Sequence, residues 1–193
     1  MNNALSKNLY AKRCETEYFD IIDDLSQVTL GKKIVRHLAD SNITDYTPVI
    51  LCIGTDRATG DCLGPLVGSE LKNYHDRYVV IGDLKSPVHA LNLRTTIERI
   101  YKEIDNPFII AVDASLGATK HIGRITLSNC PIAPGKGVNK KLPAVGNISI
   151  TGIVSMAGQS PTLLQSTRLY VVMQLASCIS SALKFAIDYL EDK

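Results

Sequence analysis

Two continuous apolar runs dominate the pattern of hydrophobic and polar positions along the chain. One is VILCI at residues 49–53, and the other is FIIAVD at residues 108–113. Runs of this kind are typical of strands that are buried on both faces, and therefore of parallel sheets covered by helices. Shorter apolar or alternating segments predict three more strands, at residues 78–81, 122–128 and 147–154.

Helical periodicity fills most of the segments between these strands. Apolar residues recur at helical spacing in three of them, which predicts helices at residues 26–40, 63–74 and 93–104. Ser26 is the expected cap of the first helix. A longer apolar stripe follows Ser160 and Pro161, a predicted N-cap with proline at the first helical position. Polar residues interrupt this stripe at helical spacing, so it predicts an amphipathic helix rather than a membrane span.

The alternation of strands and helices predicts the fold class. It favours an α/β protein with three layers, α/β/α, around a mostly parallel central sheet. Residues 1–17 carry no periodic pattern and are expected to form a flexible N-terminal arm. Residues 18–193 are expected to form a single α/β domain, and a domain of this size can bury a core without a disulfide or a metal.

Composition excludes several classes of partner. The net charge of +2 is too near neutral to favour nucleic acid or an anionic membrane, and the absence of tryptophan removes the best base-stacking residue. The five cysteines contain no CxxC pair, which fits a reducing compartment and gives no metal-finger spacing. The polar N-terminus does not resemble a secretory signal. We therefore expect a cytoplasmic protein, and we assign no metal ligands. The sequence does not identify a cofactor, and a homo-oligomer is possible.

The segment IGTDRATGDCLGP at residues 53–65 places a glycine-rich loop directly after a buried strand. Ligands of open parallel sheets bind at the carboxyl ends of strands, so Asp56 and Arg57 are candidate substrate-binding residues. Asp61 is either a functional carboxylate or the N-cap of the following helix, and the sequence favours neither. The loop matches neither dinucleotide nor P-loop spacing. Cys62 is expected to be a small buried residue rather than a nucleophile.

Asp113 ends the strongest predicted strand and is followed by small residues. An acid at this position is either a functional desolvated carboxylate or a structural anchor held by loop amides, and we favour the functional interpretation. Together with Asp61 it would form a pair, with the carboxyl groups within about 8 Å of each other. Paired acids that share a proton can act as base and acid, which is what activating water against an amide requires.

Residues 129–147 form a long predicted loop that is rich in glycine and proline and contains three lysines. Most such loops are solvated surface connectors, but the unusual length also fits a lid over a substrate. The candidate substrate contacts in this loop are Gly135, Lys136 and Gly137.

A single histidine, His89, lies in the predicted loop PVHALN that leads into a helix. A lone histidine in such a loop is more often a surface or capping residue than a ligand. His89 is nevertheless kept as a candidate substrate-binding residue, because its loop follows a predicted strand.

Four motifs together resemble the YyaC-type sporulation proteins of endospore-forming bacteria. They are CIGTDRATGDCLGPLVG, PVHALNL, AVDASLG and PGKGVN, and the resemblance extends from about residue 48 to residue 190. The layout is more distantly similar to the germination protease and to the hydrogenase-maturation endopeptidases. These relatives imply a three-layer fold of the phosphorylase/hydrolase type and cleavage of a peptide bond at one specific site.

The resemblance transfers two functional positions. Asp61 matches the first acidic position of both protease groups, and Asp113 matches the second. Two positions depart from the pattern: Ala133 stands where the proteases tend to have a histidine, and Asp56 stands where the maturation enzymes usually have asparagine. Loss of that histidine removes a metal contact or a proton partner, so metal recognition does not transfer with the acids.

Two hypotheses follow. The first is an endopeptidase of the germination-protease type, acting on a specific protein or peptide substrate in a sporulating cell or spore interior. The second is a catalytically inactive, protease-like binding or regulatory protein of sporulation. A nucleoside or small-metabolite hydrolase is less favoured, because the chain has neither a phosphate loop nor a set of base-stacking aromatic residues.

Overall fold

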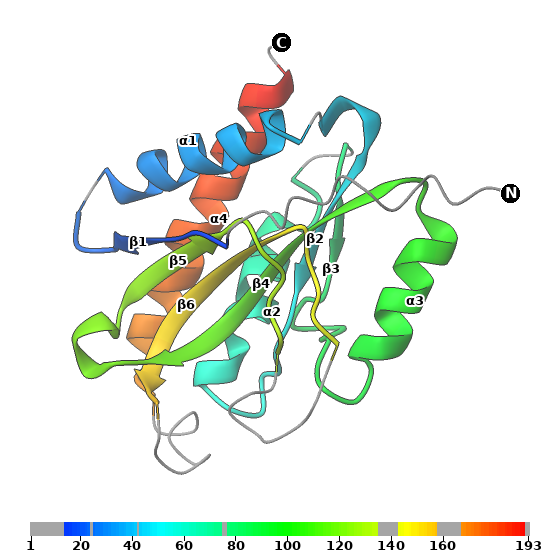
Figure 1. The fold of residues 1–193 in the computed structure, drawn as a ribbon. Helices are drawn as coiled ribbons and strands as arrows, with labels where there is room; N and C mark the ends of the chain where they lie inside the picture. Colours follow the sequence, from blue (N-terminus) through cyan, green and yellow to red (C-terminus); the bar gives the residue numbers. More distant parts are fainter. Residues whose placement is uncertain are drawn as a thin grey trace, which may run out of the picture.

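A computed structural model describes residues 14–23, 25–41, 43–74, 77–134, 143–157 and 167–191. Six strands form one sheet in the order β1-β5-β6-β4-β2-β3 (Figure 1). The strands β3, β2, β4 and β6 pair in parallel, whereas β5 is antiparallel to both β6 and β1. The strand bounds are Thr16–Asp20 (β1), Thr47–Cys52 (β2), Val79–Ile81 (β3), Pro107–Gly117 (β4), Arg124–Ser128 (β5) and Ile148–Met156 (β6).

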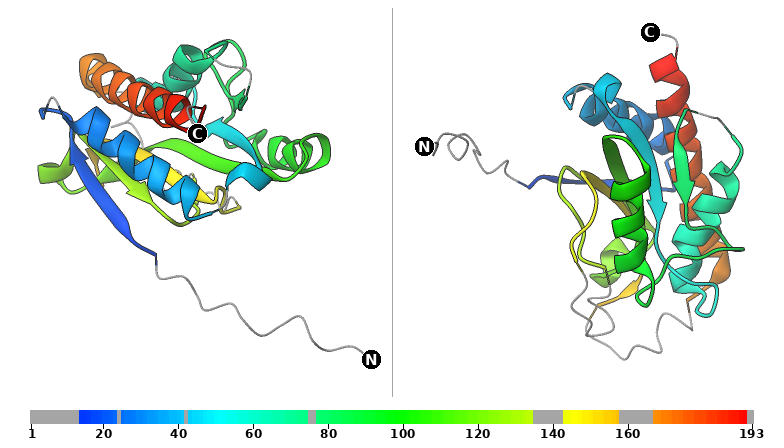
Figure 2. Two further views of the ribbon diagram at one scale, coloured as in Figure 1. Left: turned by 90° about the horizontal axis from the view of Figure 1, so that it is seen from above. Right: turned by 90° about the vertical axis from the view of Figure 1, so that its right-hand side faces the viewer.

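Helices cover both faces of this sheet, which confirms the predicted three-layer α/β architecture. Three helices lie on one face and α3 lies on the other (Figure 1, Figure 2). The α-helices are Ser26–Ala39 (α1), Leu63–Leu71 (α2), Leu93–Glu103 (α3) and Leu169–Glu191 (α4). Three short 3-10 helices span Ile43–Asp45 (η1), Gly60–Cys62 (η2) and Thr119–His121 (η3).

The continuous apolar run of β2 is explained by burial on both faces. Ile50 and Cys52 belong to the core under α1, α2 and α4, whereas Val49 and Leu51 pack on the α3 side. Successive side chains of a strand point to opposite faces, so a strand between two helical layers needs apolar residues at every position. The parallel pairing of β2 with β4 then places the carboxyl ends of both strands at one edge of the sheet.

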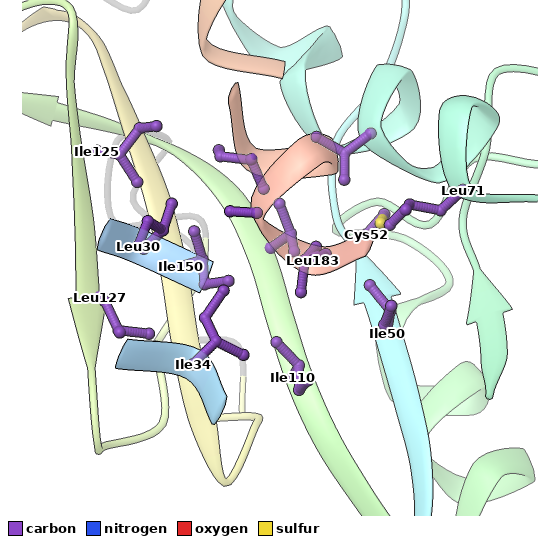
Figure 3. Packing of buried hydrophobic residues seen from close by; sticks show 14 of the residues in the cluster. Leu30, Ile34, Ile50, Cys52, Leu71, Ile110, Ile125, Leu127, Ile150 and Leu183 are labelled. Carbon is purple, nitrogen blue, oxygen red and sulfur yellow. The ribbon is translucent and has the colours of Figure 1, made fainter. Parts of the chain in front are cut away.

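The larger core lies between the sheet and the layer of three helices (Figure 3). Leu30 and Ile34 from α1 and Leu183 from α4 meet Ile110 and Ile150 from the central strands, and all five are almost completely buried. Burying a side chain of this size stabilises the fold by about 1.5–3 kcal/mol. The core therefore fixes the positions of β4 and β6, the two strands that carry Asp113 and its neighbour Thr151.

Three local predictions are corrected by the structure. Strand β1 begins at Thr16, inside the predicted arm, because TEYFD pairs with the distant strand β5. Ser26 does not cap α1, because the N-cap residue is Leu25. The Ser26 hydroxyl donates to the Asp20 carbonyl instead. Helix α4 begins at Leu169, and the predicted start at residues 160–161 lies outside the described residues.

Helix α4 is long and apolar enough, by length and composition, to cross a membrane. One face of it is nevertheless buried in the core, where Val172, Leu175 and Ile179 are fully enclosed. In the most apolar window of the helix, 44% is buried inside the protein. This arrangement is that of the amphipathic core helix that the sequence predicts.

A disulfide joins Cys14 to Cys130, which corrects the expectation of thiols kept reduced throughout. The pairing follows from the register of β1 with β5, in which Glu15 and Asn129 are hydrogen-bonded to each other just beyond the ladder. The next residues outward are the two cysteines. The sequence gives no hint of this pairing, because the two positions are separated by 116 residues.

Candidate active site

The loop after β2 folds back tightly so that Asp61 lies at the end of this strand. The backbone N–H of Thr55 donates to the Asp61 carbonyl at 3.0 Å. Gly54 has φ +144°, and a Cβ at this position would lie 2.0 Å from the same carbonyl oxygen. Only glycine fits this close approach, which explains the glycine directly after the strand.

The structure excludes the helix-cap interpretation of Asp61. Asp61 lies within η2, and helix α2 begins at Leu63 with Cys62 at its N-cap position and no side-chain capping bond. Burial instead raises the pKa of the Asp61 carboxyl, and the backbone N–H of Thr55 opposes this rise. Its carboxyl group is therefore held at the strand end rather than used by the helix.

Asp113 lies in β4 on the face of the sheet that carries α3. It follows Ile109 and Ala111 along this face, and its partner in the parallel ladder is Thr151 of β6. The side chain is buried, and one carboxyl oxygen accepts the Ala114 N–H at 2.8 Å. The structure thus places this acid on a central strand, as the sequence predicts, but within the strand rather than at its end, because β4 continues to Gly117.

The two carboxyl groups interact electrostatically. Burial raises the pKa of Asp113 well above its ordinary value, and the charge of Asp61 raises it further. Burial also raises the pKa of Asp61, but the Thr55 N–H and His89 both oppose this rise. The environments therefore separate the two acids, with Asp113 keeping its proton to higher pH and Asp61 ionising first. The predicted separation of about 8 Å stays a prediction.

His89 is brought beside Asp61 by the loop after β3. Val88 forms a parallel bridge with Ile53, and its carbonyl accepts the Gly54 N–H at 2.7 Å. The ring Nδ1 of His89 accepts the Leu91 N–H at 3.3 Å, so the proton of the neutral ring lies on Nε2. Burial raises the pKa of Asp61, and His89 is one of the two groups that oppose this rise. The sequence names His89 as a candidate, but its proximity to Asp61 comes from the fold.

A row of hydroxyl groups continues across the sheet from Asp113. Thr151 is hydrogen-bonded to Ser115 at 3.0 Å and to Thr126 at 2.7 Å. All three residues are half-buried, and they come from β4, β6 and β5. They form a polar floor next to the acids, which sequence analysis missed because single hydroxyl residues in strands carry no distinctive signal.

Among the other candidates, Asp56 and Arg57 are exposed in the loop before Asp61, and Asp56 raises the pKa of Cys62. Cys62 is buried and its thiol donates to the Thr59 carbonyl at 2.9 Å. Its pKa is raised, chiefly by burial and then by the charges of Asp61 and Asp56, as expected for a buried thiol rather than an activated nucleophile. The candidates in the long loop, Gly135, Lys136 and Gly137, lie outside the described residues.

Metal ligation has no support in the described parts of the chain. No group of three or more His, Cys, Asp or Glu side chains there is arranged to hold an ion. Ala133, at the position of the protease histidine, is described and half-buried, and it offers no ligand. Among the residues that the structure describes, the two acids thus have no third side chain of these types arranged with them to hold an ion.

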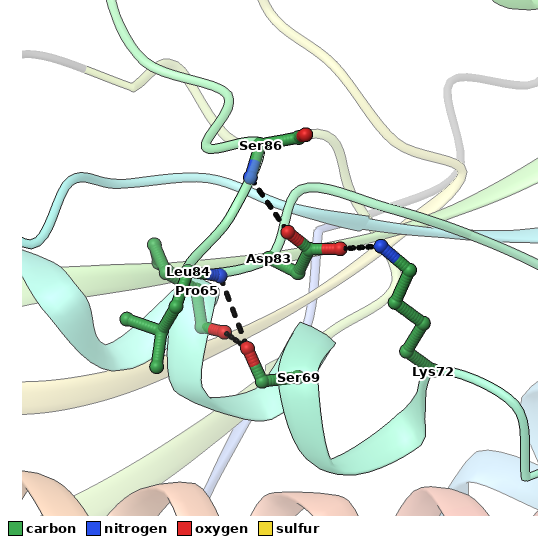
Figure 4. A network of polar contacts seen from close by, with 6 residues as sticks. All are labelled: Pro65, Ser69, Lys72, Asp83, Leu84 and Ser86. Carbon is green, nitrogen blue, oxygen red and sulfur yellow. Dashed lines mark hydrogen bonds and ion pairs between the residues drawn. The ribbon is translucent and has the colours of Figure 1, made fainter.

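Asp83 is a third acid at a strand end, and sequence analysis missed it. It lies two residues after Ile81, the last residue of β3, forms an ion pair with Lys72 and accepts the Ser86 N–H at 2.6 Å (Figure 4). The hydrogen bond from Lys72 holds the pKa of Asp83 below its ordinary value. The signal was present as I-G-D after the strand YVVI, which repeats the I-G-T-D pattern of the first loop.

The fold and the site together define an α/β protein with one buried acid, Asp113, and one half-buried acid, Asp61, that interact near the carboxyl edge of its sheet. The chain belongs to the family described as "Protein of unknown function (DUF1256)", which matches residues 19–182. The "Uncharacterized protein YyaC" of Bacillus subtilis (strain 168) is 48% identical over 137 residues, which are 70% of this chain and 67% of that protein. This similarity confirms the resemblance to YyaC.

A solved structure also resembles the fold. The NiFe hydrogenase maturation protease HycI from Thermococcus kodakarensis KOD1 matches 79% of this chain and 99% of its own. The TM-score is 0.46 and the sequence identity is 17%.

Proposed function

We propose that this protein is an endopeptidase that hydrolyses one specific bond of a protein substrate during sporulation or germination. The observation that carries the proposal is the acid pair, in which Asp113 is buried and raised in pKa while His89 and a backbone N–H support the charge of Asp61. Such a difference between neighbouring acids is the requirement for one base and one acid at the same pH. The role in sporulation or germination rests on the motifs shared with YyaC-type proteins.

In the proposed reaction, Asp61 acts as the base and protonated Asp113 acts as the acid. Asp61 takes a proton from water while the water oxygen bonds to the substrate carbonyl carbon, and Asp113 gives its proton to the carbonyl oxygen. On collapse of this tetrahedral intermediate, Asp61 protonates the leaving nitrogen as the C–N bond breaks, and Asp113 recovers a proton from the new carboxyl group. The pair thus returns to its starting state with one shared proton.

The surroundings of the pair provide binding groups for an extended substrate. The hydroxyl groups of Ser115, Thr151 and Thr126 form a half-buried polar surface beside Asp113, suited to backbone amides. The His89 Nε2 proton is available for hydrogen bonding to a carbonyl oxygen near Asp61. Asp56, Arg57 and the loop containing Lys136 are proposed to complete the binding surface.

A non-catalytic binding protein is the second candidate, and Ala133 favours it. Ala133 follows Ile132, which forms a short antiparallel bridge with Val145. The Ile132 N–H donates to the Val145 carbonyl at 3.0 Å, and the Val145 N–H donates to the Ile132 carbonyl at 2.8 Å. The protease groups tend to have a histidine at this position, and alanine can neither bind a metal nor transfer a proton. In that case the acid pair would bind a partner without turnover.

One experiment separates these candidates. Purified protein is incubated with protein extracts of sporulating cells, and new peptide termini are mapped by mass spectrometry. The Asp113→Asn variant is the matched control, because Asn keeps the shape and the acceptor for Ala114 but cannot donate the carboxyl proton. Termini at one sequence that appear with the natural protein and not with the variant support the peptidase. Identical termini in both samples contradict it.

A further inference from the structure

Strand β3 is the outermost strand of the sheet. Among the described residues it pairs only with β2, so its other edge carries backbone N–H and C=O groups without a ladder partner. An edge of this kind can accept an extended peptide as an additional strand. With three residues, Val79–Ile81, β3 offers few main-chain bonds, so side-chain contacts must supply most of the specificity.

A cavity of about 500 Å³ lies along this edge. This volume is in the range of ligand-binding pockets and accommodates a few side chains. Its walls include Val80 and Ile81 of β3. They continue through Pro87 to Val88, which is the residue before His89. The cavity therefore leads from the sheet edge toward the acid pair.

The cavity reaches both faces of the sheet at β3. Lys72, at the end of α2, contributes from one face, and Thr96 and Arg99 of α3 contribute from the other. Neighbouring side chains of a strand point to opposite faces. A peptide added to β3 would therefore direct one side chain toward Lys72 and the next toward Arg99.

The charges of the lining favour an acidic occupant. Its charged residues are Lys72, Arg99 and Asp83, so its net charge is positive. Asp83 forms the ion pair with Lys72, and Arg99 lies 3.9 Å from the exposed Glu103 carboxylate on the same helix. Asp83 is only 9% exposed, whereas Lys72 is 47% exposed and Arg99 is 58% exposed, so the cations face the solvent side of the cavity. An incoming carboxylate can bind Lys72 beside the buried Asp83, and it can replace the exposed Glu103 carboxylate at Arg99, where the existing pair is long and solvated.

The loop that contributes Asp83 and Ser86 to the cavity wall is tied to α2 by hydrogen bonds without any ligand (Figure 4). The Ser69 hydroxyl donates to the Pro65 carbonyl at 2.9 Å and accepts the Leu84 N–H at 3.0 Å. Asp83 holds the Ser86 N–H at 2.6 Å in the same loop. A preformed wall reduces the ordering that binding requires.

We propose that an acidic, extended segment of the protein substrate adds to β3 and occupies this cavity, next to the site of cleavage. The proposal rests on the proposed function and assigns its substrate-docking surface. The carboxyl end of β3 lies at the same edge of the sheet as Asp61 and Asp113, because β3, β2 and β4 are parallel. A segment held along β3 would thus present the chain beyond it to the acids.

The test is the binding of a defined probe, measured by fluorescence anisotropy. The probe is a fluorescein-labelled octapeptide of valine and threonine with two adjacent glutamates at its centre. A second peptide has lysines in place of the glutamates, and a third is N-methylated at alternate residues to remove main-chain donors. We expect saturable binding of the first peptide and binding weaker by about tenfold or more for the other two. Absence of saturation up to about 1 mM, or equal binding of all three peptides, overturns the proposal.

Two charge reversals on α3 localise the binding. Arg99→Glu changes a residue of the cavity wall, whereas Lys102→Glu makes the same change of net charge on an exposed residue outside it. We expect about fivefold weaker probe binding for Arg99→Glu and less than about twofold for Lys102→Glu. Equal effects of the two variants contradict docking at this cavity.

The same probe separates this proposal from the proposed function. Asp113→Asn should leave probe binding unchanged, because Asp113 is not part of the cavity wall. Probe binding at β3 without any substrate cleavage would refute the peptidase and keep the docking surface. Cleavage that is unaffected by Arg99→Glu would keep the peptidase and refute the docking surface.

Discussion

The charge of Asp61 raises the pKa of Asp113, although the two residues belong to different strand–loop units of the chain. The fold causes this interaction, because β2 and β4 are adjacent and parallel and both lead to the same edge. Burial acts in the same direction on both acids, while the Thr55 N–H and His89 oppose it only at Asp61. The pair therefore holds one proton more firmly than isolated carboxyl groups would.

Asp113→Asn is expected to leave the melting temperature at neutral pH unchanged or to raise it. The pKa of Asp113 is raised in the folded protein, so the unfolded chain releases this proton first, at about pH 3.9. The natural protein then loses stability as the pH rises from about 4 to the folded pKa, whereas Asn does not titrate. Thermal unfolding from pH 4 to pH 8 should show a difference in favour of Asn that is absent at pH 4 and grows above it.

The control for this substitution is Asp113→Ala, which also removes the acceptor of the Ala114 N–H. It should be less stable than Asp113→Asn by about 1–3 kcal/mol, because a buried donor is left without its partner. A large loss of stability in the Asn variant at neutral pH would show that the charged carboxylate holds the fold together.

Asp61→Ala is expected to change the free energy of unfolding by less than the loss of a helix cap, which is about 1 kcal/mol. The Thr55 N–H keeps a partner in the variant, since it also donates to the Asp61 carbonyl of the backbone. Removal of the half-buried Asp61 carboxylate in addition relieves its repulsion of Asp113. Urea unfolding at neutral pH measures the difference, and a loss of more than about 1 kcal/mol would restore the structural interpretation.

Gly68→Ala should destabilise the protein, although alanine is the better helix former by up to about 1 kcal/mol. A Cβ at residue 68 would lie 1.8 Å from the Gly82 carbonyl oxygen, so α2 and the loop after β3 would have to separate. We expect a loss of about 1–3 kcal/mol in chemical unfolding. Glu70→Ala, on the exposed side of the same helix, should stay within about 0.5 kcal/mol. Equal behaviour of the two variants would contradict the close packing.

The double variant Cys14→Ser, Cys130→Ser is expected to lose about 2–5 kcal/mol of stability, because the disulfide closes a long loop. Unfolding is measured with and without dithiothreitol. The reductant should lower the stability of the natural protein to that of the variant and should leave the variant unchanged. A natural protein that is insensitive to the reductant would show that the two thiols are not joined.

The parts of the fold that the sequence predicts are those set by local pattern. The apolar runs of β2 and β4 can be recognised because double-sided burial leaves no polar positions. Strand β1 and the Cys14–Cys130 pair could not be recognised, since both depend on pairing with β5, more than a hundred residues away. Ser26 has the residue type of a cap, but its hydroxyl has a nearer partner at the Asp20 carbonyl.

The same distinction applies to the site. Asp61 and Asp113 can be found from sequence because one lies in the loop after an apolar run and the other ends one, and the strand order then brings the two segments to the same edge. The proximity of His89 to Asp61 depends on the bridge between Val88 and Ile53, which no local pattern predicts. Asp83 could have been found by looking for acids just after the carboxyl end of β3, as for the other strands. Its partner Lys72 could not have been found in this way.

The central claim is that Asp61 and Asp113 share one proton, and carboxyl titration by ¹³C NMR tests it most directly. Chemical shifts of the two side-chain carboxyl carbons are followed from about pH 3 to pH 9 in the natural protein and in Asp61→Asn. We predict that Asp113 titrates well above Asp61 and that its pKa falls in the variant, where the repelling charge is gone. Titration of both groups near their ordinary values, with no change at Asp113 in Asp61→Asn, would contradict the paired-acid account.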